Sequence, residues 1–280
     1  MQEHTLSPVG RFERIILATD GSRYSEGAIR VAQDMARKCD ARLIVMSIGI
    51  VDPAYSTLVP NLEREAEAMA QRNIDAAKSA MEGLEVQEAI RLGSDPAEVI
   101  VATAEELRAD VIVMGRHGRR GLARWKLGHA TAKVVGHAPC PVLVVPSAAR
   151  MWEKRVLVAT DGSRYGELAA VTAGKLAQAC GLPLTAVSAV LPSHGPERRQ
   201  SAQEAINEVV EDMGRAGVSV NGHLADGRPD KAILESAGRD GADLIVMGSH
   251  GRTGMNKMLM GSVSEKVLNQ ADCAVLVVKA

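Results

Sequence analysis

The sequence predicts an α/β protein of two tandem domains, each built on a doubly wound, five-stranded parallel sheet of the Rossmann-like type. An internal repeat indicates the duplication, since ATDGSRY at Ala18–Tyr24 recurs without change at Ala159–Tyr165. Short apolar runs alternate with longer amphipathic stretches in both copies, as expected for strands joined by helical crossovers. Runs such as VIVMG are apolar throughout, which is typical of parallel strands covered on both faces.

The repeat covers nearly the whole chain. DVIVMGRHGRRG from Asp110 matches DLIVMGSHGRTG from Asp243, and the last apolar run of each copy recurs at the same spacing. A repeat of this length is a duplicated domain rather than a solenoid unit of roughly 20–50 residues. A chain of 280 residues also suits two domains of about 150 residues. We therefore predict one domain at residues 1–148 and a second at residues 149–280.

The two copies contain the same order of predicted elements. Strands of the first copy are expected at Ile15–Thr19, Arg42–Ser47, Val86–Arg91, Asp110–Gly115 and Val142–Pro146. Helices are expected between them at Ser22–Lys38, Asn61–Glu82, Pro96–Leu107 and Gly128–Gly136. Strands of the second copy are expected at Arg155–Thr160, Pro183–Ala189, Ser219–Ala225, Asp243–Gly248 and Val275–Lys279.

Local signals support these elements in turn. The first strand of each copy ends in Asp-Gly-Ser, which is turn chemistry, and Ser22 and Ser163 are placed to cap the helices that follow. The stretch Asn61–Glu82 is rich in glutamate and is expected to be an amphipathic helix with one solvated face. The last strands are short and wholly apolar, as buried parallel strands are.

Composition narrows the possible functions. Aromatic residues make up only 2% of the chain, the formal net charge is -1 and the pI is about 6.7. A base-stacking surface and a polybasic field are therefore not indicated, and we expect no nucleic-acid partner. The first residues include no apolar signal segment, and no run approaches the roughly 18 apolar residues of a membrane span. We expect a cytoplasmic protein that does not insert into membranes.

The turn after the first strand is a candidate binding position. In an open parallel sheet, ligands bind beyond the carboxyl ends of the strands, where the winding reverses. Asp20 and Asp161 stand at such ends in the two copies. The residues leave a second interpretation open, in which Asp-Gly-Ser serves only as a turn and a helix cap and binds nothing.

A glycine-spaced loop follows the fourth strand. In the second copy, Gly248 and Gly251 are separated by two residues, and nine residues later comes the run Gly261-Ser262-Val263-Ser264. Glycines at this spacing let backbone N–H groups form an anion-binding nest. The run from Gly261 opens a helix, whose N-terminus favours a phosphate, and the Ser262 hydroxyl is placed to donate to it. These groups and Asp161 are expected to converge on one crevice.

The chain resembles the nucleotide-binding subclass of the universal stress protein family, and the resemblance runs from Arg14 to the C-terminus in both copies. The family pattern is Gly, two residues, Gly, nine residues, then Gly-Ser or Gly-Thr. The resemblance implies an adenine nucleotide alpha hydrolase-like fold. It also implies that ATP or another adenine nucleotide is bound, usually with a divalent metal such as Mg or Mn. The Asp would contact adenosine, and the loop and the serine would bind phosphates.

Carried over to this chain, the resemblance implies two sites of unequal match. The second-copy residues are Asp161, Met247, Gly248, Gly251, Gly261, Ser262, Val263 and Ser264. The first-copy residues are Asp20, Met114, Gly115, Gly118, Gly128 and His129. His129 stands where the pattern has Ser or Thr, and a charged imidazole there would oppose the helix dipole. Whether the first site holds nucleotide stays open.

The residues favour a binding protein over an enzyme. The chain lacks the Walker lysine of P-loop ATPases, and no nucleophile–base arrangement is legible, so at most slow ATP hydrolysis is expected. His117 and His250 lie inside the glycine loops as phosphate donors, bases or plain loop residues. The leading hypothesis is an ATP-binding stress-response sensor or regulatory module.

Two other functions remain as alternatives. One is a nucleotide-free assembly protein, and the other is a flavin-binding protein of the same fold. Because universal stress proteins pair through their last strands, the resemblance implies a pseudo-dimer formed by Val142–Pro146 and Val275–Lys279. A homo-oligomer of whole chains, such as a dimer, is also expected, because a hydrophobic edge strand tends to be covered. The protein partner that would be regulated is unknown.

Overall fold

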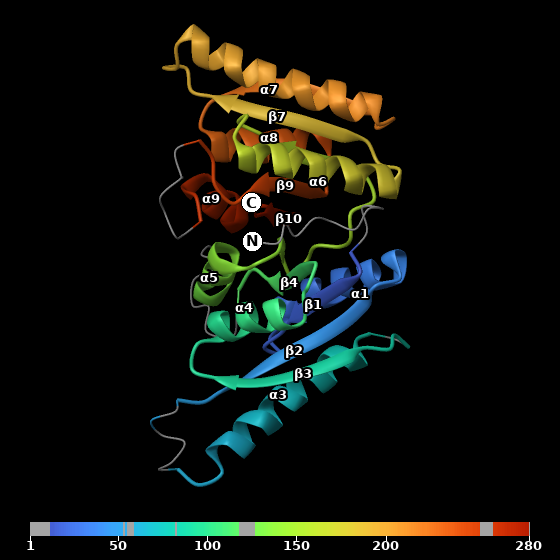
Figure 1. The fold of residues 1–280 in the computed structure, drawn as a ribbon, viewed down its shortest axis with the longest axis vertical. Helices are drawn as coiled ribbons and strands as arrows, with labels where there is room; N and C mark the ends of the chain where they lie inside the picture. The colour runs from blue at the N-terminus through green and yellow to red at the C-terminus, as the bar shows by residue number, and fades with distance from the viewer. Residues whose placement is uncertain are drawn as a thin grey trace. The chain divides into compact units, whose positions relative to one another are not determined.

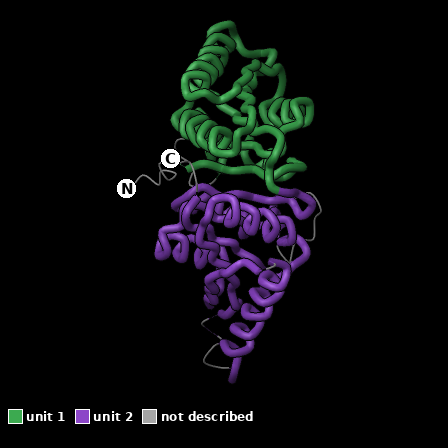
Figure 2. Tube along the Cα trace, turned by 90° about the vertical axis from the view of Figure 1, so that its right-hand side faces the viewer, with its two compact units in different colours: residues 1–11, 151–280 green, residues 12–150 purple. Residues whose placement is uncertain are grey.

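The computed structural model describes residues 12–52, 54, 59–81, 83–117, 127–252 and 260–279. Contacts divide the chain into two compact units, which Figure 2 colours separately. The first unit in chain order comprises residues 12–150 and is the purple body labelled unit 2 in Figure 2. The second unit, in its described part, begins at Met151 and ends at Lys279.

The first unit is an open parallel sheet with helices packed on it (Figure 1). Its strands are β1 (Arg14–Ala18), β2 (Arg42–Ile50), β3 (Gln87–Gly93), β4 (Val111–Gly115) and β5 (Val142–Val145). Its helices are the 3₁₀ turn η1 (Arg23–Ser25), α1 (Glu26–Cys39), α3 (Leu62–Ser79), α4 (Pro96–Glu106) and α5 (His129–His137). The strand order is β3-β2-β1-β4-β5, so the winding reverses between β1 and β4.

The second unit repeats this plan. Its strands are β6 (Val156–Ala159), β7 (Leu184–Val190), β8 (Val220–Asp226), β9 (Leu244–Gly248) and β10 (Ala274–Val278). Its helices are α6 (Arg164–Cys180), α7 (Pro196–Arg215), α8 (Pro229–Asp240) and α9 (Ser262–Gln270). All pairings are parallel in the order β8-β7-β6-β9-β10, and the winding reverses between β6 and β9. The predicted fold class is confirmed.

The core consists of aliphatic side chains on both faces of each sheet. Ile15, Ile16 and Leu17 succeed one another along β1 and are all fully buried. Successive strand residues point to opposite faces, so this run requires cover on both sides, which is why it is continuously apolar. Among the described residues, no helix has both the length and the apolar character needed to cross a membrane.

One expected element is wrong at its start. The predicted helix Ser22–Lys38 begins instead with the 3₁₀ turn η1, and Ser22 does not cap it with its side chain. The Ser25 N–H bonds the Ser22 carbonyl at 2.9 Å, and the Ser25 hydroxyl bonds Asp20 Oδ1 at 3.2 Å. In the second unit the corresponding residue is Gly166, whose N–H reaches Ser163 Oγ at 3.2 Å. The Ser163 cap is therefore confirmed, and the position of Gly166 is taken by Ser25 in the first copy.

In each unit an aspartate accepts backbone hydrogen bonds at the amino end of the first strand. Asp243 Oδ2 accepts the N–H groups of Glu153 and Lys154, at 2.7 and 3.0 Å, just before β6 begins. Asp110 Oδ2 accepts the N–H groups of Glu13 and Arg14 in the same way at β1. These carboxylates lie at the amino ends of the strands, so they stabilise the start of each central strand. They are at the other end of the strands from the Asp-Gly turns.

Candidate functional site

The turn after β6 has a closely defined hydrogen-bond pattern. Thr160 Oγ1 accepts the Gly162 N–H at 3.3 Å, and Asp161 Oδ1 accepts the Ser163 N–H at 3.0 Å. Gly162 has φ +69°, a left-handed conformation that a residue with a Cβ rarely adopts. The turn therefore holds Oδ1 of the Asp161 carboxylate and leaves Oδ2 for a partner elsewhere in the chain.

That second oxygen meets the glycine loop. The Arg252 N–H donates to Asp161 Oδ2 at 2.9 Å, across 91 residues of sequence. A Cβ added at Gly251 would lie only 2.6 Å from the same oxygen, so the close approach depends on the missing side chain. The structure thus brings together Asp161 and the glycine loop, which lie far apart in the sequence and which the sequence analysis identified as two separate motifs.

The start of the loop packs against a residue that sequence reasoning missed. Gly248 ends β9, and a Cβ there would lie 2.6 Å from Tyr165 Cβ. The Tyr165 ring in turn contacts His250, with ring centroids 5.4 Å apart, and His250 Nδ1 lies 3.1 Å from Ser249 Oγ. The signal that could have found Tyr165 is its place in the repeated ATDGSRY motif. His250 is thereby engaged within the loop's own packing.

The two serines at the start of α9, Ser262 and Ser264, differ in their exposure to solvent. Ser264 is buried, and its hydroxyl donates to the Gly248 carbonyl at 3.0 Å, which ties α9 to the end of β9. Gly261 donates its N–H to the Ser249 carbonyl at 2.9 Å, whereas Ser262 is exposed at the first helical position. Among the two hydroxyls, that of Ser262 is the accessible one.

Met247 and Val263 complete the second-copy set. Met247 is buried in β9 between Ala159 of β6 and Val277 of β10. Its side chain therefore belongs to the core of the sheet. Val263 is half-buried in the first turn of α9.

The first unit reproduces part of this arrangement. Asp20 Oδ1 accepts the Ser22 N–H at 3.0 Å, and Tyr24 meets His117 edge to face at 5.7 Å. The backbone of Gly115 is bonded by Thr131, whose hydroxyl donates to its carbonyl at 3.2 Å. This copies the tie made by Ser264 in the second unit.

The first unit departs from the Gly-Ser or Gly-Thr pattern at the start of α5, where His129 follows Gly128. Gly128 precedes α5 and donates its N–H to the Arg116 carbonyl at 2.9 Å, and His129 is exposed at the first helical position. Met114 is buried like Met247. Gly118 lies outside the described residues.

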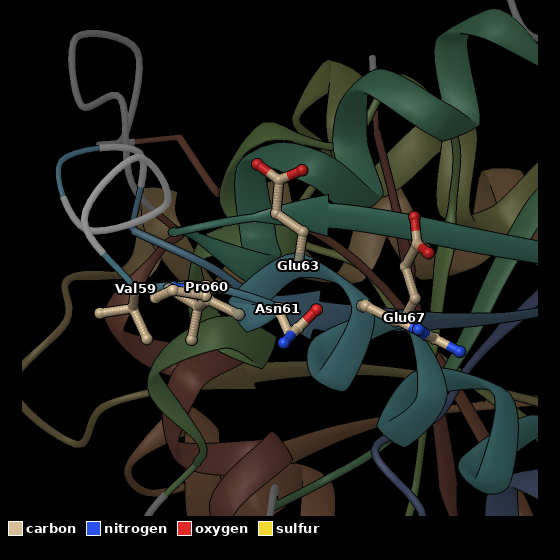
Figure 3. Close-up of a pocket in the computed structure, with 7 residues that line it drawn as sticks. Val59, Pro60, Asn61, Glu63 and Glu67 are labelled. Atoms are coloured by element: carbon tan, nitrogen blue, oxygen red, sulfur yellow. The ribbon is translucent and has the colours of Figure 1, made fainter.

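A separate cavity of about 400 Å³ lies at the start of α3 (Figure 3). Its lining comes from one continuous segment, Val59–Leu62 with Glu63, Arg64 and Glu67. Within the described part of the chain, no other turn, strand end or glycine loop lines it. Because binding sites need polar groups that converge from several elements, we assign no site to this cavity.

A single histidine of the second unit, His223, lies among polar side chains between β8 and α8. His223 Nε2 on β8 lies 3.0 Å from Ser236 Oγ and 2.7 Å from Arg239 Nη2, both on α8. Burial, together with the positive charge of Arg239, lowers the pKa of His223 below its ordinary value of 6.5, while Asp240 opposes the shift. The folded protein therefore disfavours protonated His223.

This shift predicts a pH dependence of stability. As the pH falls below about 6.5, the unfolded chain takes up a proton at this histidine before the folded chain does, so the free energy of unfolding falls. We expect His223→Gln to remove that part of the slope between pH 7.5 and 5.5, an effect below about 1 kcal/mol because the group is partly exposed. Urea unfolding of both proteins at the two pH values measures it. Equal slopes would contradict the prediction.

The described residues contain no group of three or more His, Cys, Asp or Glu side chains placed to hold a metal ion. Phosphate oxygens and water are the ligands that Mg²⁺ commonly uses in nucleotide sites.

Two tandem, doubly wound α/β units, each with an Asp-Gly turn at the carboxyl end of its first strand, define a duplicated Rossmann-like protein. The family model described as "Universal stress protein family" matches residues 11–146 and 153–279. The chain belongs to the universal stress protein family, in a tandem two-domain form with the adenine nucleotide alpha hydrolase-like fold.

Several proteins are similar to this chain in sequence or in fold. A Thermus aquaticus universal stress protein, encoded in the 3′ region of a QAH/OAS sulfhydrylase gene, is 36% identical over 136 residues, 48% of this chain and 98% of the relative. The crystal structure of a universal stress protein from Archaeoglobus fulgidus matches 95% of this chain and 98% of its own, with a TM-score of 0.76 and 23% identity. A universal stress protein in complex with cAMP matches 45% of this chain and 97% of its own, with a TM-score of 0.38 and 24% identity.

Proposed function

We propose that this protein binds ATP in the crevice of its second unit and acts as a regulatory module of the stress response. The observation that supports this most directly is the contact between Asp161 and the glycine loop, where the Arg252 N–H reaches Asp161 Oδ2 at 2.9 Å. One acidic acceptor and one loop rich in backbone donors thus border the same space at the switch point of the sheet.

The chemistry of these groups suits the two ends of a nucleotide. A carboxylate accepts hydrogen bonds and pairs well with ribose hydroxyl groups, whereas it repels phosphates. The start of α9 presents N–H groups and a positive dipole end, which favour phosphates. The exposed Ser262 hydroxyl adds a donor there. Adenosine would therefore lie toward Asp161, and the phosphates toward Gly251, Gly261 and Ser262.

A metal ion fits this proposal as a companion of the phosphates. Mg²⁺ or Mn²⁺ would be held mainly by phosphate oxygens and water, and would offset the charge of the triphosphate when bound. The protein residues would position the nucleotide and shield it. The sequence contains no GxxxxGK[ST] motif of the Walker type, so we propose binding and signalling rather than rapid hydrolysis.

The proposal has a direct test. Freshly purified protein is denatured, and the released nucleotides are quantified per mole of chain by ion-exchange chromatography. The stripped protein is then titrated with ATP in the presence of Mg²⁺ or Mn²⁺. We expect adenine nucleotide to be retained or rebound. Protein that neither retains nucleotide nor binds added ATP would overturn the proposal and favour a nucleotide-free assembly role.

The expected location and assembly state accompany this proposal. A cytoplasmic location, pairing of the two domains through their last strands and pairing of whole chains all remain predictions. Light scattering of the purified chain, with and without ATP, measures the last of them.

A further inference from the structure

In each unit a side-chain contact joins the outer strand to the end of the helix that follows it, but the two contacts differ in chemistry. In the first unit, Arg91 Nη2 on β3 lies 3.1 Å from Glu106 Oε1 on α4. In the second unit, Arg239 Nη2 in the last turn of α8 lies 2.7 Å from His223 Nε2 on β8. Arginine and glutamate side chains keep their charges between about pH 7.5 and 5.5, whereas histidine changes its charge in this interval.

The imidazole on β8 is a feature of the second unit only. His223 pairs with Val187 of β7, and at the equivalent place of the first unit Ala89 pairs with Met46 of β2. Ala89 is buried, whereas His223 is half-buried and contacts polar groups of α8. Since the first unit forms the same strand with alanine, the fold itself does not require a histidine here.

His223 faces α8 rather than α7. A Cβ built on the neighbouring Gly222 would lie 2.3 Å from Ile206 Cγ2 on α7, and successive strand residues point to opposite faces of a sheet. In the described part of the chain, the charged groups that act on His223 are Arg239 and Asp240, both on α8. The protonation of this ring is therefore governed by the end of one helix.

The contact with Arg239 indicates which ring nitrogen is unprotonated. A guanidinium has donors only, so His223 Nε2 accepts from Arg239 and carries no proton in this arrangement. The buried Ser236 Oγ lies 3.0 Å from the same nitrogen, and a hydroxyl is able either to donate or to accept. A protonated Nε2 would donate to Ser236, but it would then oppose Arg239 donor to donor and charge to charge.

Asp240 reduces this repulsion without removing it. Arg239 Nε donates to Asp240 Oδ1 at 2.8 Å, so the carboxylate already has a partner, and that bond lowers the pKa of Asp240. Arg155 also acts on Asp240, and its guanidinium donates to Thr185 of β7 at 3.3 Å. Burial and Arg239 outweigh Asp240 at the imidazole, because the pKa of His223 is lowered. Protonation therefore weakens the arrangement that the structure shows.

We propose that His223 and Arg239 form an acid-operated latch between β8 and the last turn of α8. While the imidazole is neutral, Arg239 bonds to Nε2 and the turn is held to the strand. When Nε2 takes up a proton from the solvent, Arg239 withdraws and the last turn of α8 loosens. The second unit thereby responds to acid, whereas the ion pair of the first unit does not. The latch is independent of nucleotide binding.

Hydrogen exchange of the full chain, followed by mass spectrometry at pH 7.5 and 5.5, tests this latch. Rates are corrected for the pH dependence of intrinsic exchange and read at the last turn of α8, where the Ala242 N–H bonds the Ala237 carbonyl at 2.9 Å. We expect protection there to fall about threefold to tenfold at pH 5.5, a modest loss because the contact is partly exposed. The end of α4 is the internal reference and is expected to keep its protection.

Two substitutions separate the latch from other effects of acid. His223→Gln keeps a neutral acceptor for Arg239 and is expected to abolish the loss of protection at pH 5.5. Arg239→Gln keeps a donor without the charge and is expected to remove most of the loss. His137→Gln is the matched control, because His137 is an exposed histidine of α5 in the first unit. It is expected to retain the full loss.

Three results would overturn the proposal. The first is equal protection of the last turn of α8 at the two pH values in the wild-type protein. The second is a folded His223→Gln protein that keeps the loss, and the third is a folded Arg239→Gln protein that keeps all of it. Thermal unfolding at pH 7.5 checks that each variant is folded, and the wild-type comparison decides the matter even if a variant is not.

Discussion

Asp161→Ala is expected to weaken binding of Mg-ATP to the full chain by about a hundredfold, the effect of losing charge-assisted hydrogen bonds of up to about 3 kcal/mol. The carboxylate acts twice, because Oδ1 holds the turn through Ser163 and Oδ2 joins the glycine loop through Arg252. Its removal takes away the proposed ribose acceptor and loosens the loop. Isothermal titration calorimetry measures the change.

Asp226→Ala is the matched control for this variant. Asp226 is also a carboxylate at the carboxyl end of a strand of the same sheet, but it pairs with Arg199 on the exposed side of β8. We expect its removal to leave the affinity for ATP unchanged. An Asp161→Ala protein that is folded and binds ATP as tightly as wild type would contradict the assignment of this carboxylate.

Gly27→Ala is expected to destabilise the first unit by about 1–3 kcal/mol, the usual cost of forcing extra atoms into a packed interior. A Cβ at this position of α1 would lie 2.1 Å from the Pro146 carbonyl oxygen and 3.1 Å from the Ser147 carbonyl carbon. These are backbone atoms, and Arg30 on the next turn bonds the Ser147 carbonyl, so the segment cannot withdraw freely. Chemical denaturation measures the loss.

Gly238→Ala provides the opposite case in another helix. Gly238 lies inside α8, and a Cβ there would meet nothing within 4 Å. Alanine is expected to stabilise the protein by about 0.5–1 kcal/mol, because glycine loses more backbone entropy in a helix. Equal effects of the two substitutions would show that helix propensity, rather than contact with the Pro146 segment, decides both.

Much of the site's chemistry was readable from the sequence. The repeated Asp-Gly-Ser turn, the two loop glycines and the helix start at Gly261 lie at the carboxyl edge of the sheet, as their positions after apolar strands predicted. Each of these signals is local, since turn chemistry and strand periodicity depend on residues a few positions apart. The sequence analysis placed both Ser262 and Ser264 in the site and the phosphate-donating hydroxyl at Ser262. It did not predict that Ser264 is buried, because burial depends on packing.

By itself, the sequence determined the duplication, the order of strands and helices, and the edge of each sheet on which the candidate residues gather. The tertiary structure decided which side chains from distant segments border that edge: Asn73 over Gly21, Ala205 and Arg252 over Gly162, and the Pro146 segment over Gly27. The physical reason is that strand and turn patterns are set by neighbours along the chain. The rotation and depth of a helix on its sheet are instead set by the packing of many distant side chains at once.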